Sequence, residues 1–196
     1  MARRTSNKES VPVQTDPVTY RGILRFWFEE IDKSGWWRKD PALDQQIIAR
    51  YSAIHAAANR CELYSWRASA EGRLAEIIIL DQFSRNMYRD RPRSFASDSL
   101  ALALAQEAVA DGADQEVMEI QRDFFYMPFM HSESRVIHET AVSLFETRGS
   151  RSILEYELKH KAIIDRFGRY PHRNEILGRE STADEQEFLQ QPGSGF

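Results

Sequence analysis

Apolar residues recur at helical spacing along most of this 196-residue chain. After Asp40 and Pro41, for example, Leu43, Ile47 and Tyr51 follow one another in steps of four, which places them on one face of a helix. The sequence contains no useful alternating run of polar and apolar residues and no Asn-Gly hairpin signal. This pattern predicts an all-helical fold and argues against a β-sheet.

Start and stop signals divide the chain into separate helices. An acid followed by a proline is typical of a helix start, and this pair occurs at Asp16-Pro17 and at Asp40-Pro41. Further helices are expected over about 70–83, 97–111 and 132–148. Another follows Gly149 and ends at 167, and a last one starts at Ser181 or Thr182. The glycines expected to stop helices are Gly112, Gly149 and Gly168.

Length and composition predict one domain. A chain of 196 residues with 42% apolar and 11% aromatic residues is long enough for a single hydrophobic core. We expect an all-helical domain over residues 16–190, a flexible N-terminal tail over 1–15 and a flexible C-terminal tail over 191–196. The short link Gly149-Ser150 indicates that the helices on either side of it form an antiparallel hairpin.

Net charge and cysteine usage narrow the classes of function. The net charge of −4 does not favour nucleic-acid binding, which depends on a basic surface that neutralises phosphates. The single cysteine, Cys61, cannot form an internal disulfide, and no apolar segment follows the basic start to suggest a secretory signal. The apolar runs are also too short to span a membrane. We therefore expect a cytoplasmic protein that binds neither nucleic acid nor membrane.

Asp81 interrupts the apolar stripe of the helix expected over 70–83. It follows Ile77 by four residues and Leu74 by seven, so its carboxylate should be at least partly buried. A buried carboxylate needs partners, because desolvating an unpaired charge costs several kcal/mol. Arg85 is the nearest candidate, and Arg166 or Arg173 could reach Asp81 through the fold. A structural ion pair between helices explains Asp81 equally well.

A second polar cluster precedes the helix expected over 132–148. Ser132 is a candidate N-cap with Glu133 in the first turn, and Tyr126 and His131 are expected in an aromatic-lined turn before it. Such a helix start can hold an anion. Glu133 can act in a site, or can simply complement the helix dipole.

Two histidines are candidate proton carriers. His160 occupies an apolar stripe, where a histidine is often a satisfied core residue, and His172 lies in the turn after Pro171. An imidazole with a pKa near 6.5 suits general acid or base catalysis. Neither histidine has the spacing of a zinc site, so we expect no metal and no cofactor.

Basic residues gather around a third polar cluster, which lies within residues 159–174. Residues 159–174 contain Lys159, Lys161, Arg166, Arg169 and Arg173 against one acid, Asp165. Together with the amides of Asn86 and Asn174, these guanidinium groups would suit a carboxylate or phosphate ligand. The alternative is that the arginines pair with acids on neighbouring helices.

Three motifs carry a resemblance to a known family. The segments DQFSRN (81–86), YMPFMHSE (126–133) and FGRYPHRN (167–174) resemble a bacterial family classed as a domain of unknown function, over about residues 22–189. Ser84 stands where a proline is more typical. The resemblance implies a tetratricopeptide-like, right-handed stack of antiparallel helix hairpins and supplies no activity. The family's polar positions map onto Asp81, Gln82, Arg85, Asn86, Tyr126, His131, Glu133, His160, Arg166, Arg169, His172, Arg173 and Asn174.

Three hypotheses follow for these clusters. In the first they converge on one pocket for a small anionic ligand, and any catalysis would use His160 or His172 as proton carrier, with Glu133 or Asp81 as the orienting acid. In the second the groove binds a peptide, as an adaptor does. In the third the clusters are purely architectural. Aromatic residues near the N-terminus could serve the core or a homo-oligomer interface.

Overall fold

The computed structural model describes residues 18–195, and within this range all regular secondary structure is helical. Helix α1 (Tyr20–Arg25) begins after Thr19, whose hydroxyl accepts a hydrogen bond from the amide of Gly22 at 3.2 Å. The start predicted at Asp16-Pro17 and the predicted N-terminal tail lie outside the described residues. Helix α1 continues into a π-helical turn (Phe26–Glu30), and a 3₁₀ turn (Lys33–Trp37) leads to α2 (Pro41–Asn59). The carboxylate of Asp40 caps α2 as predicted.

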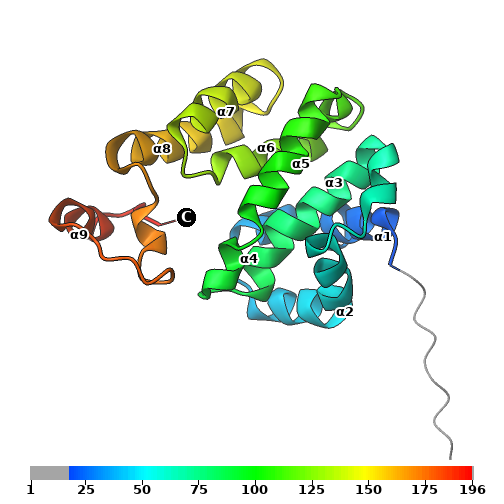
Figure 1. Cartoon of the computed structure of the whole chain (residues 1–196), viewed down its shortest axis with the longest axis horizontal. Coiled ribbons are helices and arrows are strands. Elements are labelled where there is room, and N and C mark those ends of the chain that lie inside the picture. Colours follow the sequence, from blue (N-terminus) through cyan, green and yellow to red (C-terminus); the bar gives the residue numbers. More distant parts are fainter. Residues whose placement is uncertain (1–17, 196) are drawn as a thin grey trace, which may run out of the picture.

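A nearly continuous helix runs through the centre of the molecule (Figure 1). It consists of α3 (Ala70–Ile78), a π-helical turn (Ile79–Phe83) and α4 (Ser84–Met87). Leu74, Ile78 and Phe83 are fully buried because α1, α2, α5 and α6 pack around this helix. The π-helical turn lies within the stretch predicted as one regular helix, and Asp81 lies inside that turn.

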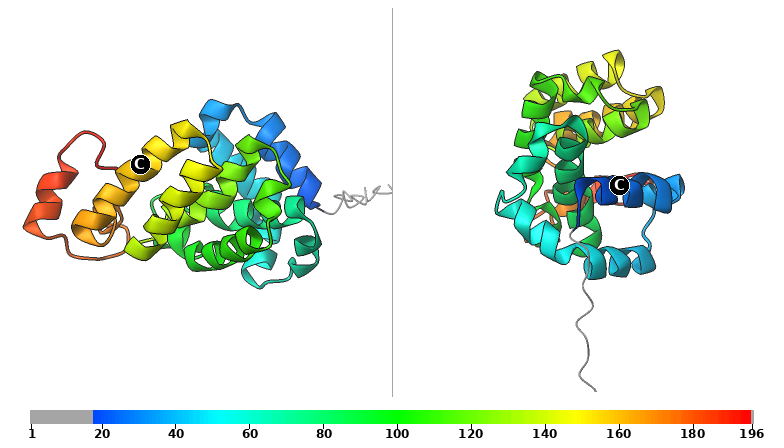
Figure 2. Two further views of the ribbon diagram at one scale, coloured as in Figure 1. Left: turned by 90° about the horizontal axis from the view of Figure 1, so that it is seen from above. Right: turned by 90° about the vertical axis from the view of Figure 1, so that its right-hand side faces the viewer.

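The remaining helices stack beside this central one (Figures 1 and 2). Helix α5 (Asp98–Ala110) is followed by Gly112, which adopts a left-handed conformation with φ +79°. Helices α6 (Glu119–Met130), α7 (Arg135–Thr147) and α8 (Arg151–Phe167) follow, and each packs on the next. Short links make these neighbours antiparallel hairpins. The right-handed tetratricopeptide-like stacking stays a prediction.

Helix α6 is the element that the sequence analysis did not predict. Tyr126 lies in its last turns and His131 is its C-cap, so the predicted aromatic turn is wrong. Pro128 is tolerated near the end of this helix, although it removes one backbone hydrogen bond. The following helix is capped by Ser134 rather than Ser132, which places Glu133 before the helix and not in its first turn.

The C-terminal segment folds against the end of α8. Gly168 ends α8 with φ +71°, a 3₁₀ turn (Pro171–Arg173) follows, and α9 (Ala183–Leu189) begins with the predicted capping box of Thr182 and Glu185. Residues 191–195 turn back toward the molecule, so that Gly195 lies beside His172 (Figure 1). Among residues 18–195, none of the helices combines the length and the apolar character that a bilayer-spanning helix requires.

Candidate functional site

A cavity of about 770 Å³ lies between α4, the C-terminal end of α6, the first half of α8 and the turn Pro171–Arg173. All three polar clusters contribute side chains to it. The predicted residues that line the cavity are Gln82, Arg85, Asn86, His131, His160, His172 and Arg173.

Asp81 lies behind the cavity wall and is only 1% exposed. One carboxylate oxygen accepts a hydrogen bond from His131 Nδ1 at 2.8 Å and lies 3.0 Å from a guanidinium nitrogen of Arg85. The other oxygen accepts a hydrogen bond from the amide of Gln82 at 2.6 Å. Burial alone would raise the pKa of Asp81, but the neighbouring charges and donors lower it below its ordinary value. Asp81 is therefore an ionised group that holds three cavity residues in place.

His131 is the histidine that Asp81 orients. The Nδ1 atom donates to the carboxylate, which leaves Nε2 as the ring nitrogen with an acceptor lone pair. Burial and the charge of Arg85 lower the pKa of His131, so the ring is neutral near pH 7. The sequence analysis named Asp81 as a candidate orienting acid for His160 or His172, whereas the ring that it contacts in the structure is that of His131.

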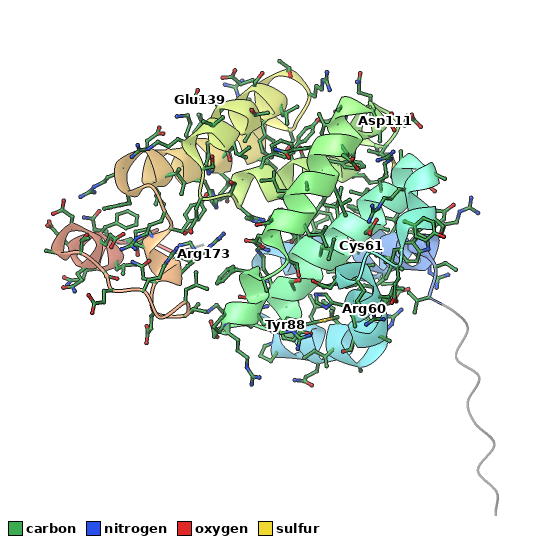
Figure 3. All side chains as sticks on the ribbon, viewed as in Figure 1. Arg60, Cys61, Tyr88, Asp111, Glu139 and Arg173 are labelled. Carbon is green, nitrogen blue, oxygen red and sulfur yellow. The ribbon has the colours of Figure 1, made fainter. Side chains whose placement is uncertain are left out.

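Two arginines of the cavity share one acid at the start of α5. Arg85 donates to both carboxylate oxygens of Asp98 at 3.0 and 3.1 Å, and Arg173 donates to one of them at 3.3 Å. Arg173 also donates to the backbone carbonyl of His131 at 3.0 Å. Figure 3 shows Arg173 on the side of the C-terminal segment that faces the central helices.

The guanidinium group of Arg173 is held between two aromatic rings. Its central carbon lies 4.5 Å from the ring centroid of Phe95 and 4.7 Å from that of Tyr170. Burial and the charge of Arg85 lower the pKa of Arg173. Among the residues described, none supplies an acceptor to its buried Nε atom. This arrangement fixes a cation at the cavity wall.

His160 and His172 also line the cavity, and both are neutral. His160 Nδ1 donates to the carbonyl of Tyr156 at 2.8 Å, and burial lowers the pKa of His160 to about 3. Burial and the charge of Arg173 lower the pKa of His172 to about 4. Neither ring carries a charge at pH 7, so the positive charge of this wall comes from arginines.

Glu133 lies outside the cavity lining. Its carboxylate pairs with Arg179 through hydrogen bonds of 2.7 and 2.9 Å and accepts a third, of 2.8 Å, from the amide of Tyr170. These donors lower the pKa of Glu133 against the opposing effect of burial. Glu133 therefore attaches the C-terminal segment to the start of α7, and its role as an orienting acid stays a prediction.

Arg169 and Asn174 are likewise structural rather than cavity residues. Arg169 forms a bidentate pair with Glu185 at 2.7 and 2.8 Å, and Asn174 donates to Ser181 at 3.0 Å. Both interactions tie α9 to the turn before it. Neither residue lines the cavity, and the roles of Arg169 as an anion clamp and of Asn174 as a ligand-binding amide stay predictions.

Tyr126 and Arg166 point to other parts of the molecule. The hydroxyl of Tyr126 donates to Asp114 at 2.5 Å, and the guanidinium of Arg166 lies 4.6 Å from the ring centroid of Phe167. Neither residue lines the cavity. The sequence placed them in a site because Tyr126 belongs to the motif YMPFMHSE and Arg166 directly precedes the motif FGRYPHRN.

Several residues that line the cavity or hold its arginines had no signal in the sequence. Phe95 lies in a 3₁₀ turn (Pro92–Phe95), and Asp98 has the ordinary position of an acid in a first helical turn. Tyr170 belongs to the motif FGRYPHRN, but the motif does not indicate that its ring packs on the guanidinium group of Arg173. In the part of the chain that the structure describes, no group of three or more histidines, cysteines and acids is arranged to hold a metal ion.

Comparisons with known proteins agree with this architecture. The model of the family "Bacterial protein of unknown function (DUF924)" matches residues 23–193. A solved structure of a protein of unknown function, ATU0120 from Agrobacterium tumefaciens, is 40% identical and superposes with a TM-score of 0.83, covering 87% of this chain and 96% of that one. No curated protein matches the chain.

Proposed function

We propose that this chain, which belongs to the bacterial DUF924 family of unknown function, binds a small organic anion in the cavity lined by Arg85, His131 and Arg173. The cavity volume of about 770 Å³ suits a metabolite-sized ligand. The proposal concerns binding, and any chemistry performed on the ligand would come in addition.

The placement of charges supports an anion rather than a cation. The lining includes five cationic side chains, and among the described residues that line the cavity Asp90 is the one acid. The acids that neutralise these cations lie behind the wall, as Asp81, Asp98 and Asp44 do. A ligand in the cavity would therefore meet hydrogen-bond donors first, which favours a carboxylate or a phosphate. The cationic side chains are Arg38, Lys39, Arg85, Arg89 and Arg173.

The observation that carries the proposal is the clamped guanidinium of Arg173. Its aromatic neighbours, Phe95 and Tyr170, and its hydrogen bonds to Asp98 and to the carbonyl of His131 hold it in one orientation, so little conformational entropy remains to be lost on binding. Its Nε has no acceptor among the described residues and is itself buried, so a ligand oxygen would reach Arg173 through the terminal nitrogens of the guanidinium group.

A thermal-shift screen of inorganic phosphate and simple carboxylates, at constant ionic strength, tests the proposal. A ligand at 100 times its Kd should add about 2.7 kcal/mol of stability. In Arg173→Gln the loss of a charged donor should weaken binding roughly 10- to 100-fold. Arg166→Gln is the matched control, because that guanidinium also lies over aromatic rings but outside the cavity. The proposal fails when no anion stabilises the protein or when both variants bind equally.

A peptide adaptor is the competing function. Trp37 and Tyr156 line the cavity and are 55% and 52% exposed, as residues that receive a peptide side chain often are. An adaptor would bind an extended peptide that ends in a carboxylate more tightly than the free amino acid with the same end group. Calorimetry with both ligands separates the two functions.

A further inference from the structure

A second hollow of about 510 Å³ adjoins the cavity on the side away from Arg173. Both hollows are bordered by the same short stretch of wall, so they are neighbours rather than separate sites. The shared lining residues are Trp36, Trp37, Met127, Ser152 and Ile153.

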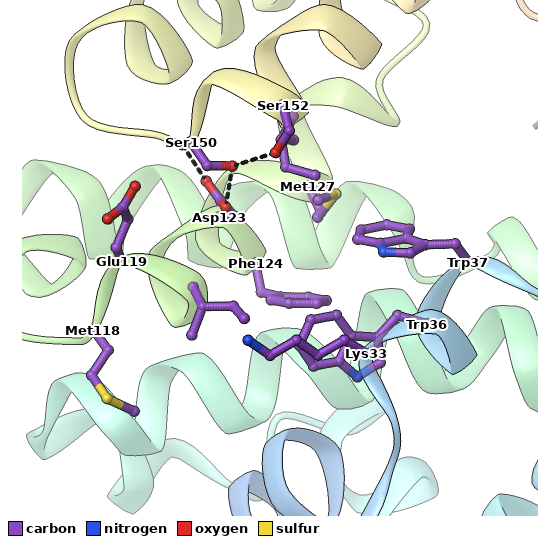
Figure 4. Close-up of a pocket in the computed structure, with 12 residues that line it drawn as sticks. Lys33, Trp36, Trp37, Met118, Glu119, Asp123, Phe124, Met127, Ser150 and Ser152 are labelled. Carbon is purple, nitrogen blue, oxygen red and sulfur yellow. Dashed lines mark hydrogen bonds between the residues drawn. The ribbon is translucent and has the colours of Figure 1, made fainter.

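The second hollow is mainly apolar and aromatic (Figure 4). The ring of Phe124 lies at its base, with centroids 5.1 Å from Trp36 and 6.3 Å from Trp37. Of the two acids in its lining, Glu119 and Asp123, the second is already engaged, because it accepts hydrogen bonds of 3.0 and 2.7 Å from the amide and hydroxyl of Ser150. Polar recognition in this hollow is therefore weak, and burial of apolar surface is what it can offer a ligand.

Three exposed apolar side chains border the two hollows. Trp37 is 55% exposed, Met118 is 63% exposed and Tyr156 is 52% exposed, and each lines one hollow or both. Contiguous exposed apolar surface next to a polar site is typical of a ligand groove. The rings of Trp36 and Trp37 are also packed edge to face, which holds this surface in place without a ligand.

We propose that both hollows bind one amphipathic organic acid, whose anionic group lies at Arg85 and Arg173 and whose apolar body extends over Met127 and Ile153 to the rings of Trp37 and Phe124. This inference rests on the proposed anion site and names the class of its ligand. A purely polar anion would leave the second hollow and the exposed face of Trp37 in water, whereas an apolar body would cover them.

The inference is tested by calorimetry with butanoate, octanoate and dodecanoate, each below its critical micelle concentration. Octyl phosphate and octanol are the two head-group controls. We expect each added methylene to tighten binding about two- to fourfold until the second hollow is filled. Octyl phosphate should bind as octanoate does, and octanol should bind at least tenfold more weakly, because it lacks the anionic group.

Variants separate the two halves of the ligand. Trp37→Ala should flatten the dependence on chain length and weaken the binding of dodecanoate more than that of butanoate, whereas Arg173→Gln should weaken all acids by a similar factor. Tyr64→Ala is the control, because Tyr64 is 72% exposed and lines neither hollow. Unfolding curves of each variant confirm that the fold is retained.

The outcomes distinguish failure of this inference from failure of the anion site. If affinity does not change with chain length but still depends on Arg173, the proposal of an amphipathic ligand is overturned and the proposed anion site is retained. Affinity that rises with chain length but ignores Arg173 overturns both proposals. A wild-type dimer that Trp37→Ala converts to a monomer, measured by light scattering, also overturns the inference, because the apolar surface would then face a second copy of the chain.

Discussion

Asp81 is the residue from which the cavity is organised. Its burial followed from the sequence, because an acid four residues after Ile77 lies on the apolar face of a helix. The contact of Asp81 with Arg85 could also be predicted, since residues four apart in a helix are neighbours. The contact with His131 could not be predicted, because His131 lies 50 residues further along the chain and only the packing of α6 on α3 brings it to Asp81.

Asp81→Asn should lower the free energy of unfolding by roughly 3 kcal/mol, because it leaves the buried guanidinium of Arg85 with less compensating charge. Urea titration measures this difference. The matched control is Asp165→Asn, which removes another pair four residues apart, with Lys161, at a 46% exposed carboxylate. That exposed pair should contribute no more than about 0.5 kcal/mol. Equal effects of the two substitutions would show that Asp81 is not the organising residue.

Stability should depend on pH through the buried histidines. The pKa of His160 in the folded protein is lowered by burial to about 3, below the ordinary value of 6.5 in the unfolded chain. Below pH 6.5 the unfolded state therefore binds a proton that the native state does not, and stability falls as the pH falls toward 3. His172 and His55, both with the pKa lowered to about 4, act in the same direction.

In His160→Phe, the slope of unfolding free energy against pH between 6 and 4 should be smaller by on the order of 1 kcal/mol per pH unit, which corresponds to one proton. Urea unfolding at a series of pH values gives the slope. NMR titration of the His160 ring in the wild-type protein provides an independent check. A slope that the substitution does not change would mean that His160 titrates normally in the folded chain.

At the scale of elements, capping signals were the reliable part of the sequence. Asp40, Gly112, Gly168 and the pair of Thr182 with Glu185 end or begin helices where they were expected to. Helix α6 was missed because Pro128 reads as a helix breaker, whereas it lies close enough to the end of the helix to be tolerated. The π-helical turn that contains Asp81 has no signature in composition, and such turns are frequent at functional sites.

Two glycines at equivalent helix positions should respond in opposite ways to alanine. Gly22 and Gly72 each follow a capping hydroxyl by three residues, at the starts of α1 and α3. An added Cβ at Gly72 would lie 2.0 Å from the carbonyl oxygen of Trp66, whereas at Gly22 its nearest neighbour would be 3.4 Å away. The turn before α3 therefore requires a glycine, and the start of α1 does not.

Gly72→Ala should cost about 1–3 kcal/mol, because the backbone at Trp66 has to move. Gly22→Ala should be neutral or should stabilise the protein by up to about 1 kcal/mol, since alanine favours the helix. Thermal unfolding of the two variants beside the wild type measures both. If Gly72→Ala does not change the stability, α3 packs less closely on the turn that contains Trp66 than it does in the structure.

At the scale of the whole molecule, the described chain has one main core and a small apolar cluster at the end of α8. The small cluster contains Ile163, Ile164 and Tyr170, with Phe167 and Phe188 packed against it. With so little apolar surface, the C-terminal segment depends on polar ties to the rest of the protein. The segment supplies His172 and Arg173 to the cavity, so its order and the shape of the cavity are linked.

Arg179 is the strongest of these ties, since it donates to Glu133 at 2.7 and 2.9 Å, to Asn174 at 2.9 Å and to the carbonyl of Tyr170 at 3.1 Å. Arg179→Gln should speed amide hydrogen exchange in α9 by about tenfold or more, because a charged hydrogen bond contributes about 1.5–3 kcal/mol to the local opening free energy. Exchange in α3, at the centre of the main core, should not change. The control is Arg50→Gln, which removes a pair with Glu30 far from the segment and should leave α9 as in the wild type. Equal acceleration of α3 and α9 would instead mean that the molecule opens as one unit, and the cavity could then not be remodelled by its C-terminal wall alone.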